Sequence, residues 1–117
     1  MARFIGGQIV VVPFPFSDLS SSKRRPALVL ADLPGDDIIL CQITSKNVKD
    51  IHTVKLYYTD IVEGSLTKES NIRPTRIFTA DKNIILKTVG KVSEEKFKEV
   101  KDKIIRLIDP PSKIQVV

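Results

Sequence analysis

Residues 23–30 read KRRPALVL, and this stretch constrains how the rest of the chain can be arranged. It begins with three cations, passes through Pro26 and continues as an apolar run typical of a buried strand. Basic side chains are almost never fully buried without a partner, so Lys23, Arg24 and Arg25 are expected where this strand meets solvent. We therefore predict that a rigid strand holds Arg24 and Arg25 at a fixed place facing water, which suits the binding of a phosphate.

Length and composition are typical of a small soluble protein. At 117 residues the chain is long enough to form one domain with its own core, and 42% hydrophobic with 28% charged residues is ordinary for a soluble globular domain. The net charge of +5 permits nucleic acid as a partner without requiring it. We expect one domain over residues 1–117.

Cysteine content and hydropathy bear on the cellular compartment. Cys41 is the only cysteine, so no intrachain disulfide can form, which fits a reducing compartment. It lies in an apolar run, and a buried, unreactive thiol is expected there. No apolar segment approaches the roughly 18 residues of a membrane span, and the N-terminus has no signal-peptide pattern. We expect a cytoplasmic protein that does not enter a membrane.

Hydrophobic patterning predicts short strands on both sides of the opening stretch. The predicted strands are residues 8–14, 26–31, 38–44, 53–58, 72–79 and 88–92. Residues 17–24 are polar and rich in serine, so a mobile loop is predicted there. A turn is predicted at residues 33–37, a polar connection at 45–52, and another connection from Gly64 onward.

The end of the chain carries the pattern of one amphipathic helix, predicted at about residues 93–108. Ser93 can cap its N-terminus, where two glutamates suit the helix dipole, and the sequence Asp-Pro-Pro at 109–111 ends it. Its apolar stripe is Phe97, Val100, Ile104, and Leu107 or Ile108. Several short strands followed by one terminal helix predict a mainly β fold, a strongly curved antiparallel sheet or barrel with the helix packed against it.

Several kinds of catalytic site are excluded by residue content. With one histidine and one cysteine, no zinc ligand set can be assembled from those residue types, and no glycine-rich phosphate loop is present. His52 lies in a polar connection without the motif of a Ser-His-Asp site, so an exposed loop histidine is expected. We predict no metal ligands and no cofactor.

Arg25 and Thr44 are the candidate catalytic residues with the clearest chemistry. Arg25 is either a strand-edge arginine with its head in water or a preorganised fork of donors for phosphate oxygens. Thr44, within Gln42-Ile43-Thr44-Ser45, is either a β-favouring residue at a strand end or a hydroxyl donor to phosphate. Lys23 and Arg24 either add positive potential or are simply solvated charges.

A second group of candidates lies along the strand predicted at residues 72–79. The two-residue period places Arg73, Thr75 and Thr79 on one face and Arg76 on the other. If the strand belongs to the sheet, one arginine faces a different environment from the other.

From about Gly6 to the terminal helix, the chain resembles the MazF/PemK-type endoribonuclease toxins. The likeness is strongest at residues 7–31, which read GQIVVVPFPFSDLSSSKRRPALVLA. Its markers are residues 7–10, the pair Arg25-Pro26 before the apolar strand, residues 42–45, Thr79 and Asp81. The resemblance implies a small SH3-like barrel of the MazF/CcdB toxin type with a C-terminal helix. It also implies a homodimer, metal-independent cleavage of single-stranded RNA, and a cognate antitoxin that covers the RNA site.

The same resemblance implies roles for individual residues. Arg25 matches the family's catalytic arginine, which stabilises phosphoryl charge and shares in proton transfer, and Thr44 matches its phosphate-orienting threonine. The implied reaction is attack of a ribose 2′-hydroxyl on the adjacent phosphorus, giving a 2′,3′-cyclic phosphate and a 5′-hydroxyl end. Arg73 matches an arginine proposed as general acid in some relatives. Thr75 stands where those relatives carry an acidic general base, so the base is not assigned.

The residues expected to bind RNA without catalysing its cleavage are polar or basic and flank the three catalytic candidates. They are Lys23, Arg24, Gln42, Ser45, Thr75, Arg76 and Thr79.

Two alternative functions remain open. A gyrase-poisoning toxin shares the expected fold, but such toxins rely on a tryptophan near the C-terminus and this chain has none. A non-catalytic SH3-like module that binds RNA or protein would show the same strands and basic residues, and only an assay for RNA cleavage separates it from an enzyme.

Overall fold

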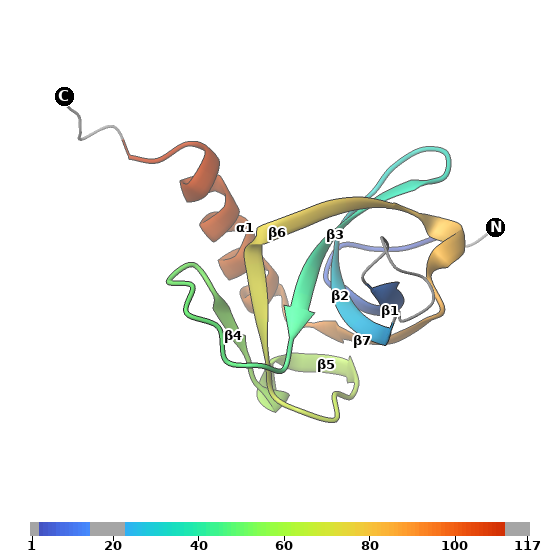
Figure 1. Cartoon of the computed structure of the whole chain (residues 1–117), viewed down its shortest axis with the longest axis horizontal. Helices are drawn as coiled ribbons and strands as arrows, with labels where there is room; N and C mark the ends of the chain where they lie inside the picture. The colour runs from blue at the N-terminus through green and yellow to red at the C-terminus, as the bar shows by residue number, and fades with distance from the viewer. Residues whose placement is uncertain (1–2, 15–22, 112–117) are drawn as a thin grey trace.

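The computed structural model describes residues 3–14 and 23–111 (Figure 1). Strands are the main regular structure of the described chain, and one carboxyl-terminal α-helix follows them. The strands are β1 (Gln8–Phe14), β2 (Lys23–Asp32), β3 (Asp37–Thr44), β4 (Val54–Leu56), β5 (Ile61–Gly64), β6 (Ser70–Asp81) and β7 (Lys87–Val92). The helices are the short 3-10 turns η2 (Tyr58–Asp60) and η3 (Lys82–Ile84), and the α-helix α1 (Glu94–Ile108). The prediction of a mainly β fold with a C-terminal helix is confirmed.

The strands form one seven-stranded sheet in the order β4-β6-β3-β2-β1-β7-β5. Every paired strand is antiparallel to its neighbour. The sheet curls strongly, and Figure 1 shows a sharp bend in β6. The bend has a cause in the register, because β3 pairs Cys41 with Ile77 but Ile43 with Ile72. Residues 73–76 therefore form an irregular bulge, and a strict two-residue alternation does not extend across it.

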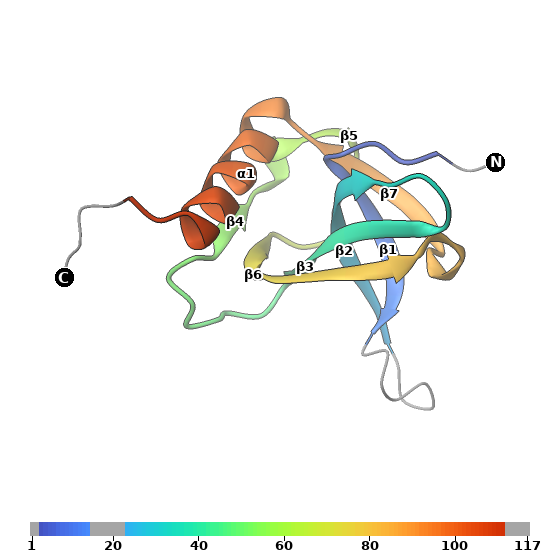
Figure 2. The same cartoon turned by 90° about the horizontal axis from the view of Figure 1, so that it is seen from above.

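Apolar residues cover both faces of the curled sheet. Side chains along a strand point alternately to opposite faces, so neighbouring residues of β1 and β2 enter different clusters. Ile9 and Leu28 belong to one cluster, whereas Val10 and Val29 belong to the other. Helix α1 packs beside β4 and covers the first cluster through Val100 (Figure 2). Burial on both faces explains why these strands read as continuous apolar runs.

Helix α1 agrees closely with its prediction. Ser93 accepts a hydrogen bond from the Lys96 amide at 3.1 Å, as an N-cap should. Leu107 is half-buried and Ile108 is 78% exposed, so Leu107 completes the apolar stripe. Lys96 is buried, and its ammonium donates to the Lys55 carbonyl at 2.8 Å, which ties the helix to β4. That inward-facing lysine was not predicted.

Two strand predictions need correction. β2 begins at Lys23, not at Pro26, because Lys23 and Arg24 pair with Phe14 and Pro13 of β1. The predicted loop at 17–24 is therefore wrong for its last two residues, and residues 17–22 lie outside the described part of the chain. The strand predicted at 53–58 is shorter, since only Val54–Leu56 is extended before η2.

Strand β5 was not predicted at all. Its four residues are too short and too polar to show an alternation, and its pairing with β7 supplies the missing stability. Gly64 ends the strand with a φ of +74°, and an added Cβ there would lie 2.0 Å from the Val89 carbonyl oxygen. Only glycine fits this close approach of two backbones.

In the described parts of the chain, no helix has both the length and the apolar character needed to cross a membrane.

Candidate functional site

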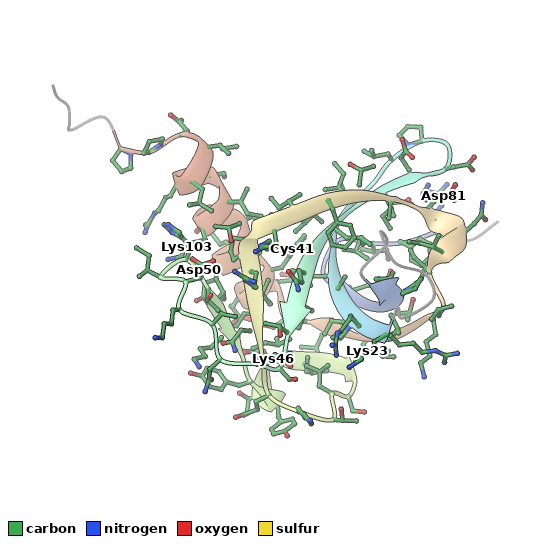
Figure 3. The ribbon with its side chains drawn as sticks, viewed as in Figure 1. Lys23, Cys41, Lys46, Asp50, Asp81 and Lys103 are labelled. Atoms are coloured by element: carbon green, nitrogen blue, oxygen red, sulfur yellow. The ribbon has the colours of Figure 1, made fainter. Side chains whose placement is uncertain are left out.

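A pocket of about 220 Å³ opens where three segments of the chain meet. β2 contributes Arg25 and Pro26, and residues 43–46 come from the end of β3 and the two residues after it. The third segment is residues 66–68 of the β5–β6 connection with Ser70, the first residue of β6. In Figure 3, Lys23 and Lys46 lie toward the same end of the molecule. The pocket thus brings together Arg25, Thr44 and Ser45 from the predicted site, although β2 and β3 supply them separately.

All charged side chains that line this pocket are positive. Its walls include Arg25, Lys46 and Lys68 and no acidic residue. Arg25 is half-buried, and its backbone is held in the ladder opposite Val12. Within residues 3–14 and 23–111, the charged side-chain groups of these three cations form no ion pair and no hydrogen bond. Their N–H groups are therefore available to an anionic ligand, and the fork of Arg25 suits phosphate oxygens.

Two hydrogen bonds set the position of the Thr44 hydroxyl. Thr44 Oγ1 accepts from the Lys46 amide at 3.2 Å, and the Lys46 carbonyl accepts from Asn71 Nδ2 at 3.0 Å. Asn71 is 5% exposed and lies directly opposite Thr44 in the β3–β6 ladder. Because Oγ1 already accepts from the backbone, the hydroxyl hydrogen remains free to donate to a ligand. Asn71 thus orients both Thr44 and the backbone of Lys46.

Arg73 and Thr75 do not line this pocket. Both lie in the bulge of β6 and contact Asp50, which belongs to the β3–β4 connection. Thr75 Oγ1 donates to Asp50 Oδ2 at 2.8 Å, and Arg73 Nη2 lies 3.7 Å from the same oxygen. In Figure 3, Asp50 lies well apart from Lys46. The shared contact agrees with the prediction that Arg73 and Thr75 face the same side.

The Asp50 carboxylate is held in its charged form. His52 donates its amide to Asp50 Oδ1 at 2.9 Å, and this bond, followed by that from Thr75, lowers the pKa of Asp50 from 3.8. Desolvation of the carboxylate acts in the opposite direction and is the smaller effect. The cluster of Asp50, Arg73 and Thr75 is therefore a counter-charged group that attaches the β3–β4 connection to the bend in β6.

The remaining predicted site residues are spread over the sheet. Gln42 is half-buried opposite Ala27, Thr79 is exposed opposite Ile39, and Arg76 is exposed within the bulge. Lys23 and Arg24 are exposed at the start of β2, immediately before Arg25. They extend the positive charge along one strand without lining the pocket.

Several residues of the pocket were not predicted from the sequence. Lys46 had a local signal, since it is a cation two residues after the candidate hydroxyl of Thr44. Thr67, Lys68 and Ser70 had none, because only the pairing of β6 with β3 brings the β5–β6 connection to this place.

Cys41 and the acidic residues add no further reactive centre to the described chain. Cys41 is buried, its thiol donates to the Arg73 carbonyl at 3.0 Å, and burial raises its pKa to about 12. The thiol is structural, as expected. Among the described residues, no three histidine, cysteine or acidic side chains gather into a group that could hold a metal ion.

Comparison with known proteins places this fold in a defined family. The family model described as "PemK-like, MazF-like toxin of type II toxin-antitoxin system" matches residues 6–108. No curated protein matches the sequence significantly.

Solved structures with the same fold are distant in sequence. An endoribonuclease from a mycobacterial species superposes with a TM-score of 0.72 at 15% identity, covering 95% of this chain and 96% of that one. Another from a mycobacterial species, in complex with its cognate antitoxin, has a TM-score of 0.73 at 12% identity, covering 93% and 98%. The MazE–MazF structure from Deinococcus radiodurans has a TM-score of 0.69 at 19% identity, covering 91% and 95%. At these identities the likeness establishes the fold.

Proposed function

Because the chain belongs to the family of PemK-like, MazF-like toxins of type II toxin–antitoxin systems, we propose that it is a growth-inhibiting endoribonuclease that cleaves single-stranded RNA without a metal. The observation that carries the proposal is the pocket described above. It places Arg25 and the Thr44 hydroxyl on one surface together with Lys46 and Lys68, and no carboxylate lines it. Such a surface is complementary to an RNA phosphate.

The proposed reaction is an internal transesterification. The ribose 2′-oxygen attacks the adjacent phosphorus and loses its proton, while the bond from phosphorus to the 5′-oxygen breaks and that oxygen gains a proton. The products carry a 2′,3′-cyclic phosphate and a 5′-hydroxyl. Arg25 stabilises the negative charge that grows on the non-bridging oxygens, since a preorganised charged donor contributes most in the transition state. Thr44 donates its hydroxyl hydrogen to one of the same oxygens.

Arg73 keeps its proposed role as general acid under one condition. Its guanidinium lies beside Asp50, so RNA must enter between the pocket and the bulge of β6 for Arg73 to reach a leaving oxygen. Thr75 bonds to Asp50 and has no basic group, so no base is assigned. Lys46 and Lys68 would hold the phosphates that flank the cleaved one.

The family also supports a set of partners. We propose a homodimer that is neutralised by a cognate antitoxin. The antitoxin part is supported by a similar endoribonuclease solved in complex with its cognate antitoxin and by the similar MazE–MazF structure. We place the toxin in the cytoplasm, where messenger RNA is translated.

The test is an RNA cleavage assay in the presence of a chelator. Purified toxin is incubated with end-labelled single-stranded RNA and excess EDTA, and the new ends are identified chemically. Cuts that end in 2′,3′-cyclic phosphate and vanish with Arg25→Ala support the proposal. A protein that binds RNA but leaves it intact would be the non-catalytic module instead.

A further inference from the structure

A second hollow adjoins the cationic pocket. It has a volume of about 240 Å³ and shares Ser45 and Ser70 with that pocket, so the two open on either side of these residues. The rest of its wall comes from Asn47, from residues 55–57 at β4, and from Glu69 and Asn71 at the start of β6. A ligand that binds in the first pocket and extends past Ser45 and Ser70 would enter this second hollow.

The chemistry of the second hollow differs from that of the first. It contains one acid, Glu69, and one cation, Lys55, so it has no excess of positive charge to attract a phosphate. Glu69 and Asn47 are exposed, and neither side chain forms a hydrogen bond or ion pair with the described residues. The hollow therefore offers a carboxylate acceptor and an amide that can donate and accept, both without partners in this part of the structure.

Tyr57 supplies an aromatic surface at the same place. Tyr57 is 46% exposed, and the Lys96 ammonium lies 5.8 Å from the centroid of its ring. That ammonium is itself fixed by the Lys55 carbonyl at 2.8 Å and by Glu99 at 2.9 Å. The ring is thus held beside the hollow while much of its surface stays accessible. Proteins that read single-stranded RNA commonly stack bases on such rings and bond to the base edges.

We propose that this second hollow is a subsite for one nucleobase next to the cleaved phosphate, with Tyr57 as the stacking surface and Glu69 and Asn47 as specificity-determining residues. The proposal rests on the function proposed above. A carboxylate accepts hydrogen bonds from the amino or imino N–H groups of a base, so Glu69 favours bases that carry such donors on their pairing edge. Uracil presents a single imino N–H between two carbonyl oxygens, and these oxygens repel a carboxylate, so Glu69 disfavours uracil.

The test measures binding, so that it does not depend on cleavage. The probes are fluorescent pentanucleotides with 2′-O-methyl riboses, which cannot be cut, and each position is varied in turn through the four bases. Their Kd values are measured for the wild type, for Glu69→Gln and for Tyr57→Leu. Glu63→Gln is the matched control, because Glu63 is an exposed acid on β5 that lines neither cavity.

The expected result is discrimination of about tenfold or more between bases at one position, the order of a single well-formed base contact. Glu69→Gln should change the ranking of bases at that position, and Glu63→Gln should keep the wild-type ranking. Tyr57→Leu should weaken binding of all probes by about 5- to 100-fold.

Equal binding of the four bases at every position, or the same base ranking in Glu69→Gln as in the wild type, would overturn the subsite. Base discrimination that depends on Glu69 in a protein that cuts no RNA would support the subsite and overturn the enzymatic function.

Discussion

Two regions of this molecule each combine an arginine and a threonine from the predicted site, yet their surroundings differ. At the cationic pocket, Arg25 has no partner within the described residues, and Thr44 accepts only from the backbone. At the bulge of β6, both Arg73 and Thr75 contact the Asp50 carboxylate. The comparison teaches that residue type alone does not define a phosphate site. What matters is whether the protein already supplies the anion.

The largest effect is expected at the pocket. Arg25→Ala should lower the rate of RNA cleavage by roughly 100- to 1,000-fold, the range for losing one preorganised charge-stabilising donor. Arg25→Lys should recover little, because a point charge replaces a bidentate fork. The measurement is single-turnover cleavage of labelled RNA, with thermal unfolding as the control for folding. Wild-type rates in the alanine variant would show that Arg25 is not the catalytic group.

A smaller loss is expected for the arginine that faces Asp50. Arg73→Ala should slow cleavage by no more than about 100-fold, the lower end for general acid–base catalysis, since its guanidinium is shared with a carboxylate. The measurement is the single-turnover cleavage rate of Arg73→Ala beside that of Arg25→Ala under identical conditions. If the two losses were equal, RNA would have to displace Asp50 from Arg73 during the reaction.

Loss of the Thr44 hydroxyl should lower the cleavage rate by less than either arginine substitution. Thr44→Val keeps the shape and strand propensity, and we expect about a 3- to 10-fold fall in rate, the value of one neutral hydrogen bond, with little change in thermal midpoint. Asn71→Ala should cause a fall of similar size, because Asn71 holds Lys46 and, through it, Thr44.

A double-mutant cycle tests whether Asn71 acts through Thr44. If it does, Asn71→Ala should slow the Thr44→Val enzyme far less than it slows the wild type. A full, additive loss in the double variant would assign Asn71 a separate role.

The salt dependence of RNA affinity can be compared between a variant of a pocket lysine and a variant of a lysine outside the pocket. RNA affinity should fall with added salt, and Lys68→Gln should reduce the slope of log K against log salt by about 0.7, the value for one phosphate on a single strand. Lys98→Gln on α1, whose ammonium pairs with Asp102 and which does not line the pocket, is the control and should leave the slope unchanged. An affinity that does not vary with salt would favour a protein partner over RNA.

The smallest effect concerns pH and the Asp50 cluster. The pKa of Asp50 is lowered in the folded protein, so its contribution to stability is present above its ordinary value of 3.8 and is lost as pH falls through the folded value. Asp50→Asn should therefore lower the thermal midpoint at pH 7, and the difference from the wild type should shrink toward pH 3. A difference independent of pH would mean that the charge of Asp50 contributes nothing.

Local pattern in the sequence determined most of the secondary structure. The apolar runs of β1, β2 and β3 and the stripe of Phe97, Val100 and Ile104 depend on near neighbours only, and their strands and helix were predicted within a few residues. The strand β5 at Ile61–Gly64 was not predicted, because four residues are too few to show a periodic pattern. Its extended conformation depends on its pairing with β7.

The residues of the candidate site also fall into those that the sequence could predict and those that only the fold brings together. Arg25 and Thr44 could be identified from their positions at the ends of buried strands and from the family resemblance. Only the tertiary structure brought Lys68 to the pocket and Asp50 to Arg73. The physical reason is that both contacts join segments far apart in the sequence, across a bulge in β6 that shifts the register between Cys41 and Ile43. The two-residue periodicity of the sequence cannot reveal such a register shift. The shift places Arg73 beside the Asp50 carboxylate, whereas Arg25 has no carboxylate partner among the described residues.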